Sequence, residues 1–206
     1  MTLHSSNHKF SIAPLYGLIL SGGKSSRMGT DKALLNYHGR PQQELLYELA
    51  TEFCEKTFIS LREEQREYLP KKYRVIQDLN EFRGPLNGIL SAHRKYPEAA
   101  WMVIACDLPL LNKNTLELLV QGRDAAKDAT ALATKTTKLP EPLAAIWEPK
   151  GLQHAIAYLK NANSSCPRKF LINNDTQLIY PENDAVLANA NSIDDYKRIK
   201  EELNSP

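Results

Sequence analysis

Short apolar runs alternate along the chain with longer segments in which apolar residues recur at helical spacing. Runs without polar interruption are typical of strands in a sheet that is covered on both faces. The pattern predicts strands at residues 15–20, 56–61, 73–77, 101–106, 129–134 and 143–147. It predicts helices at residues 42–54, 63–69, 86–96, 113–122, 151–160 and 193–203, the last one capped by Ser192.

This order of elements predicts an α/β fold of three layers, in which a mostly parallel sheet lies between two layers of helices. No internal repeat or long linker divides the chain, so we expect a flexible leader over residues 1–14 and one domain over residues 15–206. Ligands of such folds bind beyond the carboxyl ends of the strands. The residues that follow the predicted strands are therefore the first candidates for function.

The composition favours a globular protein of the cytoplasm. The 206 residues include 26 Lys and Arg against 24 Asp and Glu, a net charge of +2, which argues against nucleic-acid binding through a broad basic face. No apolar run approaches the roughly 18 residues of a membrane span, and the leader lacks the apolar segment of a secretory signal. The three cysteines are scattered and predict neither a disulfide framework nor a zinc site.

The first predicted strand runs directly into a loop of glycine, serine and basic residues, SGGKSSRMGTDK at positions 21–32. Paired glycines allow backbone N–H groups to approach an anion closely, and Lys24, Arg27 and Lys32 add positive charge. The spacing fits neither a Walker A loop nor the GxGxxG fingerprint. The loop is interpreted as a polyphosphate site, with an ordinary glycine-rich turn as the alternative.

Two aspartates follow later strands. Asp78 precedes the turn Gly84-Pro85, and its carboxylate can accept hydrogen bonds from a base or a ribose. Asp107 ends the fourth strand, where a carboxylate can bind Mg²⁺ whose remaining ligands are phosphate oxygens and water. By position alone, the turn at Gly84 simply opens a helix, and Asp107 serves equally well as a cap for the helix that begins near Asn112.

The run LILSGGKSSRMGTDKALL, residues 18–35, resembles the signature LAGGxSxRMGxDKALL of the MobA-like nucleotidyltransferases, which include molybdenum cofactor guanylyltransferases and their cytidylyltransferase relatives. Ser21 stands where the family usually has alanine. Further segments are similar to the family elements D…GPLxGI, CDxPxL, PLxAxY, SLRxFL and FxNxNTPEDL, so that the resemblance extends from Leu15 to Leu203. It implies a Rossmann-like, GT-A-like nucleotidyltransferase architecture.

The resemblance also implies an activity, the transfer of GMP from GTP to the terminal phosphate of molybdopterin, with release of pyrophosphate and with Mg²⁺ as cofactor. A phosphate acceptor is already anionic at neutral pH, so the reaction needs positioning and charge stabilisation rather than a general base. GTP and molybdopterin are the implied substrates, and other proteins of molybdenum cofactor biosynthesis are implied as transient partners.

Roles for single residues follow from the same resemblance. The implied catalytic residues are Arg27, which balances charge on the leaving pyrophosphate, Lys32, and Asp107, which binds the metal. Nucleotide binding is assigned to Leu20, Ser21, Gly22, Gly23, Lys32, Asp78, Gly84 and Asp107. Acceptor binding is assigned to Asn189, Asn191 and Arg168. Two alternatives stay open here: Asn191 merely begins the last helix, and Arg168 lies on a solvated helix face.

The identity of the base is less well determined by the sequence. The pair Gly22-Gly23 is closer to the guanylyl members, but residues 60–63 read SLRE where those members often carry an asparagine. An asparagine amide reads a base edge in a way that leucine cannot. The alternatives are a cytidylyltransferase, another nucleotidyltransferase with a different phosphorylated acceptor, and a non-catalytic nucleotide-binding protein of the same fold. The presence of both Lys32 and Asp107 argues against the last.

Overall fold

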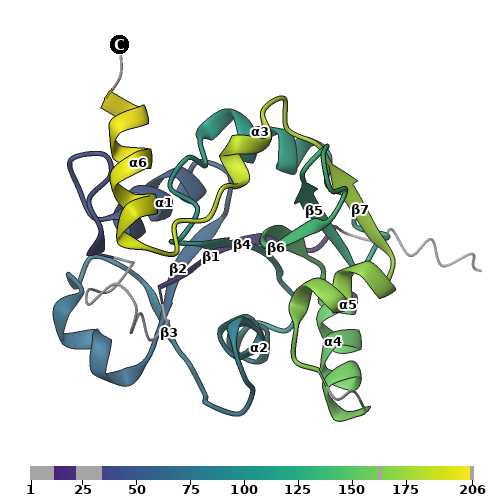
Figure 1. The fold of residues 1–206 in the computed structure, drawn as a ribbon. Helices are drawn as coiled ribbons and strands as arrows, with labels where there is room; N and C mark the ends of the chain where they lie inside the picture. The colour runs from purple at the N-terminus through teal and green to yellow at the C-terminus, as the bar shows by residue number, and fades with distance from the viewer. Residues whose placement is uncertain (1–11, 22–33, 162–163, 205–206) are drawn as a thin grey trace, which may run out of the picture.

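The computed structural model describes residues 12–21, 34–161 and 164–204. Within these residues, one seven-stranded sheet has the strand order β3-β2-β1-β4-β6-β5-β7 (Figure 1). The strands are β1 (Leu15–Leu20), β2 (Lys56–Leu61), β3 (Val75–Gln77), β4 (Ala100–Ala105), β5 (Ala129–Ala133), β6 (Pro140–Trp147) and β7 (Thr176–Ile179).

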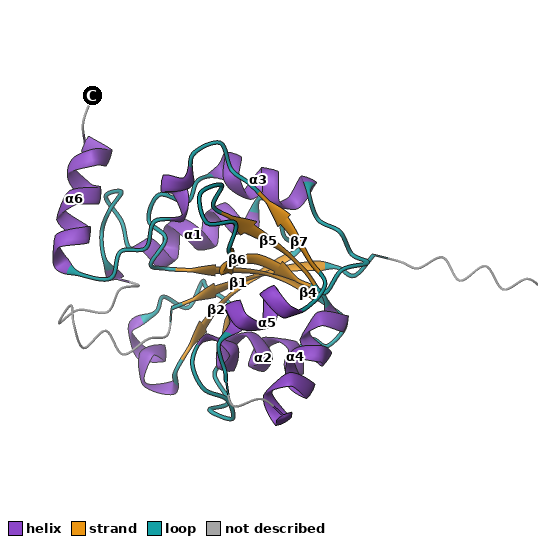
Figure 2. Ribbon diagram, turned by 45° about the vertical axis from the view of Figure 1, so that its right-hand side comes forward, coloured by secondary structure: helices purple, strands orange, loops and turns teal. Residues whose placement is uncertain are grey.

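Helices cover both faces of the sheet. They are α1 (Gln42–Thr51), α2 (Pro85–Lys95), α3 (Lys113–Gln121), α4 (Pro149–Asn161), α5 (Pro167–Asn173) and α6 (Ile193–Asn204), with 3₁₀ turns at η2 (Glu63–Tyr68) and η3 (Asp184–Leu187). Figure 2 shows α1 and α3 on one face and α2, α4 and α5 on the other. Among the described helices, none has the length and apolar character that crossing a membrane requires.

The three layers follow from the alternation of side chains along each strand. In β1, Ile19 packs into the same core cluster as Leu46 of α1, whereas Leu18 packs into the cluster that holds Ile89 of α2. Because both faces are covered, β4 carries a buried apolar residue at every position, and the neighbouring β1 is buried at five of its six positions. The predicted three-layer α/β architecture is confirmed.

The sheet is mostly parallel, as predicted, and β6 runs against its neighbours. Its register with β4 pairs Trp101 with Trp147 and Ile104 with Ala144. The strands β1, β2, β3 and β4 all terminate at one end of the sheet, and we call this end the carboxyl edge. Since β6 is antiparallel, its first residues lie at the carboxyl edge.

Some predicted bounds differ from the structure. The third strand is shorter than predicted, the segment at 63–69 forms a 3₁₀ turn, and α5, η3 and β7 were not predicted as elements. Residues 1–11 of the predicted leader lie outside the described residues. At its end, the Ala13 carbonyl accepts a hydrogen bond from Arg123 at 2.9 Å, and the Pro14 carbonyl accepts one from the Ala100 N–H at 3.0 Å.

Candidate functional site

The end of β1 is held next to the end of β4. Leu20 pairs with Ala105 in the parallel register, and the Cys106 N–H donates to the Leu20 carbonyl at 3.4 Å. Ser21 and Asp107 therefore leave the sheet from adjacent strands. This register places the start of the glycine-rich loop beside the aspartate that the sequence predicts as the metal ligand.

Two further contacts fix the backbone at Ser21, which is buried. Its N–H donates to the Ser60 carbonyl at 3.1 Å, and its hydroxyl donates to Gln43 Oε1 of α1 at 2.7 Å. The chain thus enters the glycine-rich loop from a fixed position. The predicted site residues Gly22, Gly23, Arg27 and Lys32 lie outside the described residues, and their assignments remain predictions.

Asp78 follows β3 and faces β2. The Ser60 hydroxyl donates to Asp78 Oδ1 at 2.5 Å, and the Asp78 N–H donates to the Leu61 carbonyl at 3.0 Å. Burial raises the pKa of Asp78, although hydrogen bonds from Ser60 and Asn87 and the charge of Arg62 act in the opposite direction. The fold therefore keeps a partly desolvated carboxylate at the carboxyl edge, where it can accept hydrogen bonds from a ligand.

The first turns of α2 lie against this carboxylate because of two glycines. Gly84 precedes the helix with φ of +66°, in the left-handed region that favours glycine. A Cβ atom on Gly88 would lie 2.5 Å from Ser60 Oγ, 2.9 Å from Leu20 Cδ2 and 3.3 Å from Asp78 Oδ1. Glycine at this position lets the helix approach the ends of β1, β2 and β3. Gly84 opens the helix as predicted, and its contact with a nucleotide remains a prediction.

Asp107 lies in the turn after β4, half-buried, with its Oδ1 atom buried. It does not cap α3, because the Asn112 side chain accepts the Thr115 N–H at 3.0 Å and performs that role. In the part of the chain that the structure describes, no three His, Cys, Asp or Glu side chains form a ligand group for a metal. A single half-buried carboxylate fits Mg²⁺, which commonly takes one or two carboxylates and completes its shell with phosphate oxygens and water.

The segment before α6 returns to Asp107. The Ala190 N–H donates to the Asp107 carbonyl at 2.9 Å, so that Asn189 and Asn191 flank a residue attached to the turn after β4. Ser192 accepts the Asp195 N–H at 3.1 Å, which confirms it as the N-cap of α6. Asn191 thus precedes the helix and also lies next to the Asp107 turn.

Two tyrosines join α6 to the segment that follows the glycine-rich loop. The rings of Tyr37 and Tyr196 meet edge to face with centroids 4.8 Å apart, and the Tyr196 hydroxyl donates to the Asn36 carbonyl at 3.0 Å. Burial raises the pKa of Tyr37, and the charges of Tyr196 and Asp107 raise it further. Tyr37 therefore lies within electrostatic reach of Asp107, which the sequence interpretation did not foresee.

Arg168 of α5 is anchored to the start of β6. Its Nε donates to the Pro140 carbonyl at 3.0 Å, and its Nη2 donates to Glu141 Oε2 at 2.7 Å. Arg168 is exposed on its helix, as the alternative expects, but its guanidinium is held by these two contacts. The buried Glu141 was missed as a candidate, and the signal was present: it is a charged residue between two prolines at the start of an apolar strand.

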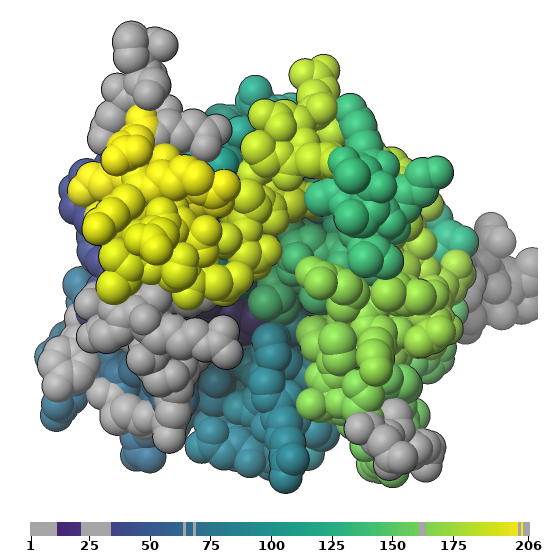
Figure 3. All heavy atoms as spheres, viewed as in Figure 1, coloured from purple at the N-terminus to yellow at the C-terminus, as the bar shows by residue number. Residues whose placement is uncertain are grey.

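Figure 3 shows where these segments meet the surface. The surface is recessed between the segment that leads into α6, drawn in yellow, the blue-teal residues around α2, and the yellow-green residues around α5. These segments carry, respectively, Asn189 and Asn191, Gly84, and Arg168. The recess is thus bordered by three segments that are distant from one another in the sequence.

Comparisons with known proteins show the family to which this sequence is similar. A family model described as a MobA-like NTP transferase domain matches residues 17–177. A molybdenum cofactor biosynthesis bifunctional protein of Synechocystis sp. is 40% identical over 187 residues, which cover 90% of this chain and 54% of that protein. A molybdenum cofactor guanylyltransferase of Pseudomonas fluorescens is 32% identical over 186 residues, which cover 88% of this chain and 91% of the relative.

A solved structure is similar as well. The crystal structure of molybdopterin-guanine dinucleotide biosynthesis protein A from Archaeoglobus fulgidus aligns with a TM-score of 0.72 and 25% identity, over 90% of this chain and 97% of that chain. The fold is therefore shared along almost the whole length of both proteins. By contrast, the chain spans about half the length of the bifunctional relative.

Proposed function

The chain belongs to the MobA-like NTP transferase family, and we propose that it transfers GMP from GTP to the terminal phosphate of molybdopterin, with release of pyrophosphate. An oxygen of the acceptor phosphate attacks the α-phosphorus of GTP, and the bond from that phosphorus to the β-phosphate oxygen breaks. The attacking phosphate is already anionic, so no proton has to be removed from it. The protein's task is to align two anions and to offset their charge.

One observation carries this proposal. The register of β1 with β4 brings Ser21, where the signature loop begins, beside Asp107 at the carboxyl edge. A loop suited to phosphates and a carboxylate suited to a phosphate-bound cation thus emerge from neighbouring strands. Ligands of open α/β sheets bind at this edge. The names of two relatives, a molybdenum cofactor guanylyltransferase and a molybdopterin-guanine dinucleotide biosynthesis protein, support GMP as the transferred nucleotide and molybdopterin as the acceptor.

Each candidate residue has a place in this proposal. The backbone at Leu20, Ser21, Gly22 and Gly23, with Lys32, holds the triphosphate, and Arg27 offsets charge on the departing pyrophosphate. Asp78 and the turn at Gly84 bind the nucleoside, while Asn189, Asn191 and Arg168 bind the acceptor. Asp107 would hold Mg²⁺, which when bound supplies positive charge to the reacting phosphates.

A second candidate is the transfer of CMP or another nucleotide to a phosphorylated acceptor. It is favoured by the end of β2, where Leu61 is buried and no asparagine occurs among residues 60–63. A base that enters here meets no side-chain amide from this run. The Asp78 carboxylate can accept hydrogen bonds from the donors of guanine as well as from the amino group of cytosine.

The test is a comparison of pyrophosphate release with GTP, CTP and ATP, each with and without molybdopterin, in the presence of Mg²⁺. The proposal predicts release with GTP that depends on molybdopterin and exceeds release with CTP at least tenfold. A preference for CTP would support the second candidate function, the transfer of CMP. No release with any nucleotide, in a protein that still binds GTP, would identify a non-catalytic nucleotide-binding protein.

A further inference from the structure

Glu141 lies near the start of β6, the strand that pairs with β4, and Asp107 follows β4. The β4–β6 register pairs Ile104 with Ala144, and each further step along β4 is one step back along β6. β4 ends at Ala105, and Asp107 lies in the turn that follows it, at the same end of the sheet as Glu141. The charge of Asp107 acts on Glu141 and helps to raise its pKa, which agrees with this closeness.

Glu141 is buried, with 7% of its surface exposed, and its two carboxylate oxygens have different partners. Oε1 accepts the Leu143 N–H at 3.2 Å, and Oε2 accepts Nη2 of Arg168 at 2.7 Å. The first contact fixes the carboxylate to its own strand. The second contact holds the guanidinium of Arg168, which lies in α5.

Arg168 is more exposed than its partner, with 45% of its side chain accessible against 9% for Glu141. A guanidinium has five N–H donors in one plane, and the contacts to Pro140 and Glu141 use two of them. The same fork geometry suits the oxygens of a phosphate. The pair thus presents a partly exposed cation whose orientation is set from the buried side.

We propose that Glu141 is a positioning residue for the transfer reaction, which holds the Arg168 guanidinium beside Asp107 so that Arg168 binds the phosphate of the acceptor. This inference rests on the proposed function. Glu141 does not touch the reacting atoms, and its effect passes through Arg168. A guanidinium that is already oriented loses less side-chain freedom when the acceptor binds. Arg168 also offsets the negative charge of the Glu141 carboxylate, on which the charge of Asp107 acts too, and this negative charge would otherwise repel an anionic acceptor.

The test compares steady-state kinetics of Glu141→Gln, Arg168→Ala and the double variant with those of the unmodified protein, with GTP and molybdopterin varied separately. Glutamine has nearly the same shape as glutamate and can still accept the Leu143 N–H, but it carries no charge to orient Arg168. Thermal melting and GTP affinity show that each variant is folded.

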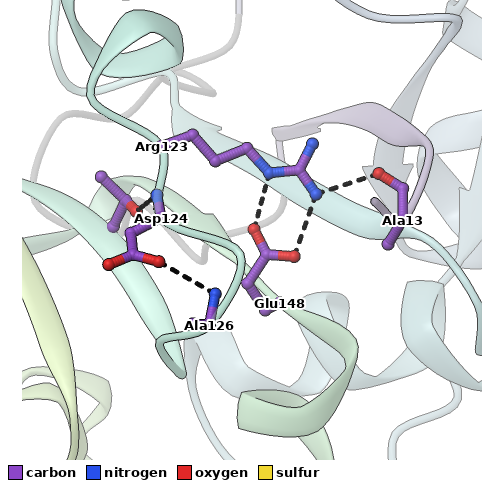
Figure 4. Close-up of polar contacts among 6 residues, drawn as sticks. Ala13, Arg123, Asp124, Ala126 and Glu148 are labelled. Atoms are coloured by element: carbon purple, nitrogen blue, oxygen red, sulfur yellow. Dashed lines mark hydrogen bonds and ion pairs between the residues drawn. The ribbon is translucent and has the colours of Figure 1, made fainter. Parts of the chain in front are cut away.

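A matched control lies at Glu148, directly after the other end of β6 (Figure 4). Arg123 donates from Nε and Nη2 to the two oxygens of Glu148 at 2.7 and 2.9 Å, and Glu148 is 2% exposed. Glu148 lies about 24 Å along the strand direction from Glu141, at the rise of a strand residue. Glu148→Gln therefore disturbs a buried arginine–glutamate pair without disturbing the carboxyl edge.

We expect Glu141→Gln to raise the KM for molybdopterin about tenfold, with the KM for GTP within twofold of the unmodified protein. Arg168→Ala should raise the molybdopterin KM at least as much, and Glu141→Gln should add nothing further in its background, because coupled residues are not additive. Glu148→Gln should lower the melting temperature and leave both KM values within twofold.

An unchanged molybdopterin KM in folded Glu141→Gln would overturn the inference, and so would additive effects in the double variant. If Glu141→Gln does not fold, an Arg168→Ala variant with the unmodified molybdopterin KM overturns it instead. Each of these results would refute the positioning role of Glu141 but not the proposed function, as long as the unmodified protein transfers GMP. An unmodified protein without transfer refutes the proposed function itself.

Discussion

Asp78 is a carboxylate whose burial works against folding. Because burial raises its pKa in the folded protein above the unfolded value of about 3.9, the folded state binds the proton more tightly than the unfolded state. The stabilising contribution of Asp78 to the free energy of unfolding is therefore fully present below about pH 4, and it is lost as the pH rises through the raised pKa of the folded state. At neutral pH, Asp78 costs stability, as functional residues often do.

The variant Asp78→Asn separates the two roles. It should melt at a higher temperature than the unmodified protein at pH 7, and the difference should vanish as the pH falls below about 4, where Asp78 is protonated in both states. Its KM for GTP should rise about tenfold, since a hydrogen bond to a charged group is worth about 1.5–3 kcal/mol. Melting curves from pH 3 to 8 and GTP kinetics measure both effects. Lower stability at pH 7 with an unchanged GTP KM would make Asp78 a purely structural residue.

Sequence reasoning succeeded with residues whose position alone is informative. Asp78 and Asp107 each end an apolar run, and the fold places the ends of parallel strands at one edge. It failed with Ser60 and Glu141, whose partners Asp78 and Arg168 are distant in the sequence. Such roles depend on strand register and helix placement, which no local pattern encodes.

At the scale of elements, α6 closes one side of the candidate site. Its N-terminal segment is tied to the Asp107 carbonyl through Ala190, and its body contacts the segment after the glycine-rich loop through Tyr37 and Tyr196. Tyr37, Ala190 and Ile199 form a small buried cluster of their own, separate from the two main cores. These contacts help to hold Asn189 and Asn191 at the carboxyl edge.

Tyr196→Ala removes the ring contact and the hydrogen bond to the Asn36 carbonyl together. An aromatic pair contributes about 0.5–1.5 kcal/mol beyond its burial, so α6 should open more often. We expect amide hydrogen exchange in α6 to accelerate about tenfold and the molybdopterin KM to rise severalfold, with little change in the GTP KM. Tyr196→Phe keeps the ring and should show a smaller effect of the same sign. Unchanged exchange in Tyr196→Ala would show that other contacts hold the helix.

The elements themselves were predictable where both faces of a strand are buried. Residues 15–20 and 56–61 were predicted with their observed bounds because each strand is buried at five of its six positions and is mainly apolar. The strand β7 was missed because it lies at the edge of the sheet, is half-buried, and reads TQLI. The direction of β6 is not encoded by its own apolar pattern, and this antiparallel direction brings Glu141 to the carboxyl edge.

At the scale of the whole molecule, the sheet separates stability from function. Its carboxyl edge carries the candidate site, and its opposite end carries the Arg123 cluster, in which one guanidinium joins Glu148 and the Ala13 carbonyl. Both side chains of the pair are well buried, with 12% and 2% exposed. Loss of one partner from such a pair leaves an uncompensated charge.

Arg123→Ala should lower the free energy of unfolding by about 3 kcal/mol, which corresponds to a fall of about 6–12 °C in melting temperature for a chain of this length. Both KM values should stay within twofold, because the cluster lies at the far end of the sheet. Arg94→Ala is the matched control, since Arg94 pairs with Glu81 on an exposed surface and should change the melting temperature little. A large rise in the GTP KM of Arg123→Ala, measured well below its melting temperature, would show that the two ends are coupled.

The most direct test of the central claim, that GMP transfer takes place at the carboxyl edge beside Asp107, is the rate of molybdopterin-dependent pyrophosphate release from GTP and Mg²⁺ by Asp107→Ala. The account predicts a fall in kcat of about 10²–10³-fold or more, the magnitude typical of removing one group that stabilises charge in a transition state, in a protein that melts near the temperature of the unmodified chain. A folded Asp107→Ala variant whose kcat stays within threefold of the unmodified protein would contradict the account.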